Sequence, residues 1–307
     1  PVEIETLPAT VLHSSAGWWT HCVVTVENQP YCWGNNTGNL FVSGNEAKSW
    51  QPMQPFTVTG ETVSAISVAE SHACLLYQGA DAQCWGSNEY GQLGKGDNLL
   101  AGSGALAEEI APNGASNRVA LGDISALDSA GNGTCAVTGS GGVYCWGRNL
   151  AGLLGAAQPG YSATPAAIPG LASGVKQVAV GRFSSVAEFA CALLQSGGVK
   201  CWGGIDLSSG ISSPAAVYTP VDMPGVTSGV LSLHAGDEHV CAIMQNGSVK
   251  CLGALPTDAG PEVEYTFTEI TKLGTSNKTV VMGFNFLCVL KTSGAVLCLG
   301  GGELGTL

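Results

Sequence analysis

Short apolar runs separated by glycine-containing turns recur along the whole chain. One example is Cys74-Leu-Leu-Tyr, which is followed by the turn Gln-Gly-Ala and by a second run that ends in Cys84-Trp-Gly. Short runs of this kind, bounded by turn residues, are typical of β-strands. A further apolar run that ends in small residues precedes each such pair, at 10–17, 63–69, 124–131, 175–181, 230–236 and 280–283. The pattern predicts an all-β chain of repeated antiparallel hairpins, each with one more strand before it.

The cysteines indicate the register of these hairpins. The chain has twelve, and they fall into six pairs whose partners are ten positions apart: Cys22 with Cys32, Cys74 with Cys84, Cys135 with Cys145, Cys191 with Cys201, Cys241 with Cys251, and Cys288 with Cys298. If the partners face each other, the residues between them leave three cross-strand pairs and a three-residue loop whose third residue is left-handed. Glycine or asparagine suits that position. The sequence has Asn28, Gly141, Gly197, Gly247 and Gly294 there, with Ala80 as the exception.

We therefore predict six disulfides, one within each hairpin. Directly opposed strand residues have Cα atoms about 4.5–5.5 Å apart, within the range that a disulfide requires. Each would contribute about 3 kcal/mol in the chain-entropy model. Free buried thiols are the alternative, and zinc is not favoured because the spacing is not a zinc-ligand spacing.

Cysteine usage also predicts a compartment. Disulfides persist in oxidising environments, and the chain starts at Pro1 without a basic and apolar leader. We expect a processed secreted protein or a cell-surface ectodomain. Four N-x-S/T sequons agree with this expectation and are possible glycosylation sites: Asn35, Asn132, Asn246 and Asn277.

Six units of about fifty residues predict a six-bladed β-propeller. After each hairpin come tryptophan or leucine and then glycine, a polar loop, and a Pro-containing segment that we expect to form an outer strand. Each blade would then be a four-stranded antiparallel sheet with one intra-hairpin disulfide. We expect one domain over 1–307, with inner hairpins at 22–32, 74–84, 135–145, 191–201, 241–251 and 288–298. Residues 2–5 would supply the outer strand of the last blade.

Charge and motifs exclude several function classes. The net charge is −12 with only eleven Lys and Arg, so a nucleic-acid partner is not expected. No apolar run reaches the ~20 residues that span a bilayer. Metalloprotease, serine-hydrolase and phosphate-loop motifs do not occur in the sequence. We therefore expect no enzyme activity, no metal and no cofactor.

The second repeat carries the clearest family resemblance, in Glu70-Ser-His-Ala-Cys-Leu-Leu and in Cys84-Trp-Gly-Ser-Asn-Glu-Tyr-Gly-Gln-Leu-Gly. This pattern resembles the regulator of chromosome condensation repeat family, in a secreted, disulfide-containing version like the extracellular repeats of crinkly-type plant receptor kinases. The resemblance implies a propeller, and it implies that His72 and His239, two residues before a first cysteine, hydrogen-bond backbone groups. It argues fold better than function, because such folds host many roles.

Residues that break the repeat are the candidate binding sites. Four of the seven tryptophans belong to Cys-Trp-Gly, whereas Trp18, Trp19 and Trp50 do not. Trp18 and Trp19 lead into the first hairpin, and Arg182 and Phe183 lie at the corresponding place in the fourth repeat. Packing against a neighbouring blade is the alternative role for the tryptophans. The leading hypothesis is a non-enzymatic extracellular module that presents a propeller face to a protein partner. The alternatives are a secreted enzyme inhibitor, similar to the propeller inhibitor of β-lactamase, and a glycan-binding module.

Overall fold

The computed structural model of the chain describes residues 7–36, 40, 48–79, 81–96, 118–156, 160–183, 187–205, 217–257, 260–283 and 286–300. The predicted closing strand at 2–5 and the unusual turn at Ala80 lie outside these residues. The chain divides into two compact units, the first ending in the third repeat and the second containing the last three. That 1–307 behaves as one domain stays a prediction.

The first unit contains three antiparallel sheets. One terminal residue of β10 and one of β11 belong to the second unit. The first sheet consists of β1 (Val11–Ala16), β2 (Thr20–Thr25), β3 (Pro30–Asn35) and β4 (Lys48–Met53). The second consists of β5 (Val63–Val68), β6 (His72–Tyr77) and β7 (Ala82–Gly86), and the third of β8 (Ile124–Ala130), β9 (Gly133–Thr138), β10 (Val143–Arg148) and β11 (Tyr161–Ala167).

The second unit also contains three antiparallel sheets. The first of them consists of β12 (Val175–Phe183), β13 (Ala187–Leu194), β14 (Val199–Gly203) and β15 (Val217–Asp222). The next consists of β16 (Val230–Ala235), β17 (His239–Met244), β18 (Val249–Thr257) and β19 (Gly260–Glu269). After the short 3₁₀ helix η2 (Thr271–Leu273) follow β20 (Asn277–Met282), β21 (Phe286–Lys291) and β22 (Val296–Gly300).

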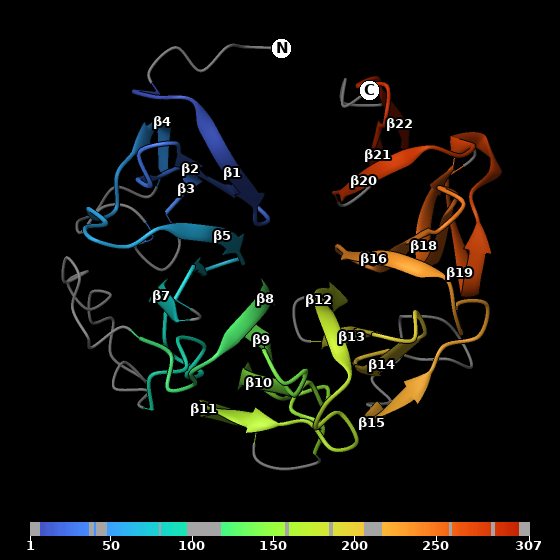
Figure 1. The fold of residues 1–307 in the computed structure, drawn as a ribbon, viewed down its shortest axis with the longest axis horizontal. Coiled ribbons are helices and arrows are strands. Elements are labelled where there is room, and N and C mark those ends of the chain that lie inside the picture. Colours follow the sequence, from blue (N-terminus) through green and yellow to red (C-terminus); the bar gives the residue numbers. More distant parts are fainter. Residues whose placement is uncertain are drawn as a thin grey trace. The chain divides into compact units, whose positions relative to one another are not determined.

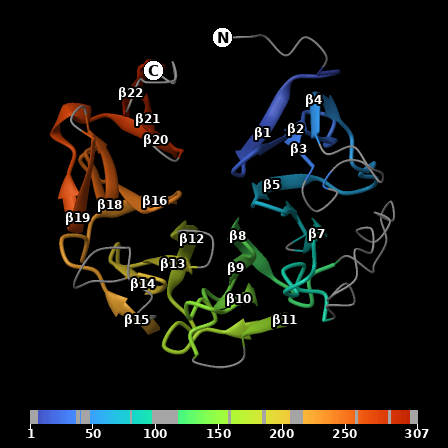
Figure 2. The ribbon, with the colours of Figure 1, turned by 180° about the vertical axis from the view of Figure 1, so that it is seen from behind.

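Each sheet is one repeat and one propeller blade, so the chain has the predicted six-bladed β-propeller fold. Within each unit, the first strand of a sheet lies against the first strand of the next sheet: β1 beside β5 and β5 beside β8, then β12 beside β16 and β16 beside β20 (Figures 1 and 2). The first strands are therefore the inner strands of the blades. Their ends need small residues, because a Cβ added to Gly17 would lie 2.1 Å from the carbonyl oxygen of Ala69 in the next blade.

The predicted disulfides are confirmed in every blade, and their Cα atoms lie 4.0–4.1 Å apart. In the first unit, Cys22 is bonded to Cys32, Cys74 to Cys84, and Cys135 to Cys145. In the second unit, Cys191 is bonded to Cys201, Cys241 to Cys251, and Cys288 to Cys298. The alternative of free buried thiols is therefore wrong.

The hairpin register predicted from the cysteines is confirmed as well. The partners of each described pair face each other across the hairpin, as Cys22 faces Cys32 between β2 and β3. The third loop residue has a positive φ wherever the structure describes it, at Asn28, Gly141, Gly197, Gly247 and Gly294. Turn chemistry and cysteine spacing thus specify the same register in each of these hairpins.

The Cys-Trp-Gly tryptophans join consecutive blades. The indole Nε1 of Trp85 donates to the carbonyl of Leu40, that of Trp146 to Gln92, and that of Trp202 to Leu153, at 2.8–2.9 Å. Each acceptor lies in the polar loop of the preceding repeat, and the three indoles are at most 1% exposed. A buried indole N–H needs an acceptor, and the polar loop supplies one. These three indoles therefore pack between consecutive blades.

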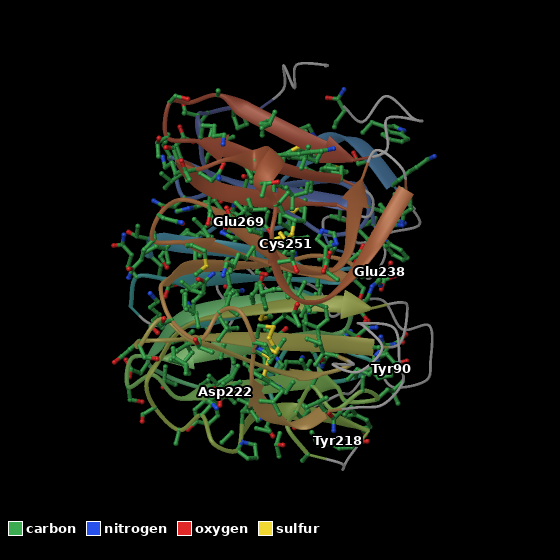
Figure 3. The ribbon with its side chains drawn as sticks, turned by 90° about the vertical axis from the view of Figure 1, so that its right-hand side faces the viewer. Tyr90, Tyr218, Asp222, Glu238, Cys251 and Glu269 are labelled. Carbon is green, nitrogen blue, oxygen red and sulfur yellow. A yellow bond between two sulfur atoms is a disulfide. The ribbon has the colours of Figure 1, made fainter. Side chains whose placement is uncertain are left out.

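Every blade has two distinct ends. We call the end where the first strand turns into the second the loop end, and the end where the disulfide hairpin turns the hairpin end. In the second unit, Glu238 and Tyr218 lie toward the loop ends and Asp222 and Glu269 toward the hairpin ends, with Cys251 between them (Figure 3). The residues that break the repeat lie at loop ends.

Candidate functional site

In the first two blades, the connection between the first and second strand is a three-residue loop held by backbone hydrogen bonds. In the first blade, the N–H of Gly17 donates to the carbonyl of Thr20, and the N–H of Asn35 donates to that of Trp19, both at 2.8 Å. The same two bonds hold the second blade, from Ala69 to His72 and from Ser87 to Ser71, at 2.9 and 2.8 Å. The loop backbone is therefore a fixed frame that presents two side chains.

The first blade carries two tryptophans on this frame. The other such loops that the structure describes carry polar or small residues at the same positions: Glu70-Ser71, Gly131-Asn132 and Asp237-Glu238. The loop conformation thus does not require an aromatic residue. Trp18 is 41% and Trp19 is 63% exposed, and their ring centroids lie 6.1 Å apart with planes tilted by 41°. Exposed indoles retain unfavourable apolar surface, which a partner could cover.

Trp50 lies at the same end of the same sheet. β3 pairs with β4 so that Gly34 faces Ser49 and Asn35 faces Lys48, while Thr20 faces Gly34 from the other side. Trp50 is 78% exposed, the highest value among the large apolar side chains described. The Nζ of Lys48 lies 5.0 Å from its ring centroid, a cation–π geometry. We call Trp18, Trp19, Lys48 and Trp50 the tryptophan end.

Arg182 and Phe183 are placed differently. They end β12, which the fourth-repeat insertion lengthens, since Arg182 pairs with Glu188 and Phe183 with Ala187. The side chain of Arg182 is only 3% exposed, and its Nε lies 3.7 Å from Asp237 in the next blade. The side chain of Phe183 lies outside what the structure describes, and its predicted role in partner binding stays a prediction. Arg182 therefore joins two blades in this structure, and its predicted role in partner binding stays a prediction.

The two repeat histidines are buried but not equivalent. The Nε2 of His72 is 2.8 Å from the hydroxyl of Thr134 in the next blade. The expectation that this ring nitrogen bonds to backbone is therefore wrong. Neither ring nitrogen of His239 has a well-formed hydrogen bond among the described residues. Burial lowers the pKa of His72 to about 3 and that of His239 to about 4. For His239, the backbone of Asp237 acts in the opposite direction and raises the pKa in part.

A missing partner explains the difference between the two histidines. Thr134 directly precedes the first cysteine of its repeat, and the residue at that position in the last repeat is Leu287. A leucine side chain cannot hydrogen-bond, so His239 lacks the partner that His72 has. Both rings are neutral at pH 7, and both are fully buried. A structural role fits them better than general base catalysis, because a buried ring is closed to substrate.

The four sequons have different surroundings. Asn246 is exposed at a hairpin tip, where its Oδ1 accepts the N–H of Ser248 at 2.9 Å. Asn277 is 5% exposed, and its Nδ2 donates to two backbone carbonyls. The Oδ1 of Asn132 accepts from Ser71 and Gln92. Asn35 ends β3, and the third residue of its sequon lies outside the described residues. Glycosylation stays a prediction, which the geometry favours most at Asn246.

In the part of the chain that the structure describes, no cluster of three His, Cys, Asp or Glu could hold a metal ion. The helices of that part include none long and apolar enough to cross a membrane.

The family comparison agrees with this repeat architecture. Residues 140–187 match the family of the Regulator of chromosome condensation (RCC1) repeat. The chain carries RCC1-like repeats. The RCC1 domain-containing protein RUG3, mitochondrial, from Arabidopsis thaliana is 26% identical over 150 residues, which are 48% of this chain and 31% of that protein. The matched part spans 31% of RUG3, 4% of the human E3 ubiquitin-protein ligase HERC2 and 43% of the Ultraviolet-B receptor UVR8 from Arabidopsis thaliana, so it covers less than half the length of each of these relatives.

Solved structures share the fold of these RCC1-like repeats. Human WBSCR16 has a TM-score of 0.77 and 16% identity, with 96% of this chain and 77% of that chain covered. Prp20p from Saccharomyces cerevisiae has a TM-score of 0.68 and 20% identity, with 89% and 66% covered, and its structure was described with its binding to Gsp1p and histones. At these identities the likeness concerns the fold. It also shows that RCC1-like propellers include proteins that bind other proteins.

The sequence indicated only part of the tryptophan end. Trp18 and Trp19 were predicted, whereas Lys48 and Trp50 join them only through the pairing of β4 with β3. The signal available for Trp50 was that it stands outside Cys-Trp-Gly. Nothing in the spacing of residues 19 and 50 predicts that they share one end of a sheet.

Proposed function

We propose that this protein is a non-enzymatic extracellular binding module that holds a protein partner at its tryptophan end. The observation that carries the proposal is the Trp18–Trp19 pair, exposed on a loop whose backbone is hydrogen-bonded in the same way as the polar loop of the second blade. Tryptophan is among the residues that dominate binding energy at protein interfaces.

The scaffold supports this role. Each blade has its own disulfide, and the Cys-Trp-Gly indoles of the second, third and fourth blades bond to the preceding blade. A preorganised surface loses little conformational freedom on binding. The six disulfides also favour an oxidising, extracellular-type environment. Prp20p, which shares the fold, was described with its binding to Gsp1p and histones. The acidic chain of this protein would take a different protein partner.

A loop exchange tests the proposal. Trp18→Glu with Trp19→Ser places the residues of the second blade on the same frame, so the fold should persist. The wild type and this variant are immobilised and exposed to the extracellular fluid in which the protein occurs, and retained proteins are identified after cross-linking. We expect one stoichiometric partner that the wild type retains and the variant loses. Tyr161→Ser, which removes another exposed aromatic ring of the first unit (43% exposed), is the control and should retain it.

Two results would contradict the proposal. One is a partner that the loop variant binds as well as the wild type does. The other is substrate turnover that persists through purification and disappears on substitution of His72 or His239. If the retained partner is an enzyme whose activity falls in proportion to added protein, the binding module acts as an inhibitor.

A further inference from the structure

We propose that the tryptophan end binds a polypeptide segment in which large apolar side chains stand next to a carboxylate. This inference rests on the proposed function and names the chemistry of the partner. Trp18 and Trp19 would receive the apolar side chains, and Lys48, beside Trp50, would pair with the carboxylate.

The tryptophan end has two halves, Trp18 with Trp19 and Lys48 with Trp50, and both lie within reach of one short peptide. Thr20, Gly34 and Ser49 form one row across β2, β3 and β4, with Trp19 next to Thr20 and Trp50 next to Ser49. Neighbouring strands are about 4.8 Å apart, so the backbones at Thr20 and Ser49, next to the two halves, lie about 10 Å from each other. Extended peptide advances about 3.3 Å per residue. A segment of roughly four residues can therefore touch both halves.

Charge complementarity points to a carboxylate. In the first unit, Arg118 is paired with Glu61, and Arg148 is 5% exposed and lies over a tyrosine ring. Lys48 instead lies over the ring of Trp50 and is exposed. In a chain of net charge −12, this ammonium group is a local site for an anionic group of a partner. Covering it with that partner would strengthen the pair by lowering the local dielectric.

Ring geometry favours a polypeptide over a glycan chain. Successive sugars stack on aromatic rings that offer a common flat face, whereas the planes of Trp18 and Trp19 are tilted by 41°. Over one face of Trp50 lies the ammonium group of Lys48, 5.0 Å from the ring centroid. Tilted rings at 6.1 Å instead suit the insertion of individual side chains, as aromatic anchors at protein interfaces do.

Fluorescence anisotropy with three labelled synthetic peptides tests this inference. The peptides share two tryptophans and one leucine and differ only in whether two neighbouring positions are Asp, Asn or Lys. We expect the Asp peptide to bind the full chain and the Asn and Lys peptides to bind about tenfold more weakly or worse. Lys48→Gln should weaken the Asp peptide about tenfold, and Lys48→Glu should make the Lys peptide the preferred one. The Trp18→Glu, Trp19→Ser variant should bind none, and Tyr161→Ser should behave like the wild type.

The outcomes separate this inference from the proposed function. Equal binding of the three peptides, binding of none, or an Asp preference that survives Lys48→Glu overturns it. Binding of neutral oligosaccharides that the loop variant loses would assign the tryptophan end to glycans instead. If the natural partner is retained through Trp18 and Trp19 while the peptides fail, the binding function stands and only the partner chemistry is wrong.

Discussion

At the scale of single residues, two buried histidines show that the same residue at the same repeat position can find a hydrogen-bond partner in one blade and lack it in another. His72 bonds to Thr134, while His239 faces a blade in which Leu287 stands at the corresponding place. Phenylalanine occupies the histidine position in the fourth and sixth repeats, and Phe189 there is fully buried. The backbone therefore accepts an aromatic ring without polar atoms at this position.

We expect His239→Phe to stabilise the protein and His72→Phe to destabilise it. An unsatisfied buried polar group costs about 1–3 kcal/mol, which the first substitution removes. The second instead removes a hydrogen bond and leaves Thr134 without it. Urea unfolding of both variants measures the change in the free energy of unfolding. Equal effects of the same sign would show that Thr134 does not distinguish the two sites.

The residue before each inner strand gives a second prediction. This position has positive φ at Gly174 and Gly229, and the same holds at Ser276, where φ is 67°. A non-glycine residue is strained in this region, so Ser276→Gly should raise the free energy of unfolding by about 0.5–1 kcal/mol. Gly229→Ser is the matched reversal and should lower it, since φ there is 76° and a Cβ would meet no close backbone atom. If both changes destabilise, loss of side-chain contacts outweighs backbone strain.

At the scale of elements, a hairpin depends on the polar loop of the repeat before it. In the third blade, the disulfide between Cys135 and Cys145 and the turn define the hairpin within one repeat. The indole of Trp146 then attaches this hairpin to the polar loop of the preceding repeat. A repeat of this kind does not supply the hydrogen-bond acceptor for the indole N–H of its own tryptophan. Stability must therefore come from neighbouring blades together, as in other repeat proteins.

Trp146→Phe should expose this dependence. It keeps most of the apolar contact but leaves the carbonyl of Gln92 without the indole N–H at 2.9 Å. We expect a loss of about 1–3 kcal/mol in the free energy of unfolding, measured by chemical denaturation. Trp50→Phe is the control, because Trp50 is 78% exposed and the same substitution there should change stability by less than about 0.5 kcal/mol. A similar loss at both positions would mean that indole size, and not the hydrogen bond, matters.

At the scale of the whole molecule, two buried histidines and the half-buried His234 make stability depend on pH. Burial lowers the pKa values of His72 to about 3 and of His234 and His239 to about 4, whereas an unfolded histidine titrates near 6.5. Below that value the unfolded chain binds protons that the folded chain does not. The contribution of these neutral histidines to the free energy of unfolding is therefore complete above about pH 6.5 and is lost as pH falls toward 4.

Thermal unfolding between pH 7.5 and 4.5 should show this loss. Each fully buried histidine contributes a slope of up to about 1.4 kcal/mol per pH unit once the pH is below the unfolded pKa. His239→Phe should reduce the slope relative to the wild type by the contribution of one proton. An unchanged slope in this variant would show that His239 is protonated in the folded protein.

The disulfides also give a prediction for the whole chain. Complete reduction of the denatured protein should raise its mass by about 12 Da, two hydrogens for each of six bonds. Intact-mass measurement before and after reduction checks this value. A smaller gain would mean that some of the twelve cysteines are free in the isolated protein, contrary to the pairing of all six hairpins.

The sequence alone determined the repeat, the hairpin register, the disulfides and the propeller fold, because these depend on contacts between residues close in the chain. Cysteine spacing and a left-handed turn residue are short-range signals, and they recur often enough to be unambiguous. Only the tertiary structure decided which residues of different strands meet. Pairing of β4 with β3 brought Lys48 and Trp50 to the loop that carries Trp18 and Trp19. Packing of neighbouring blades buried Arg182 against Asp237 and gave His239 no well-formed hydrogen bond among the described residues. Those contacts depend on the length and course of the connecting segments, which no local pattern of residues encodes.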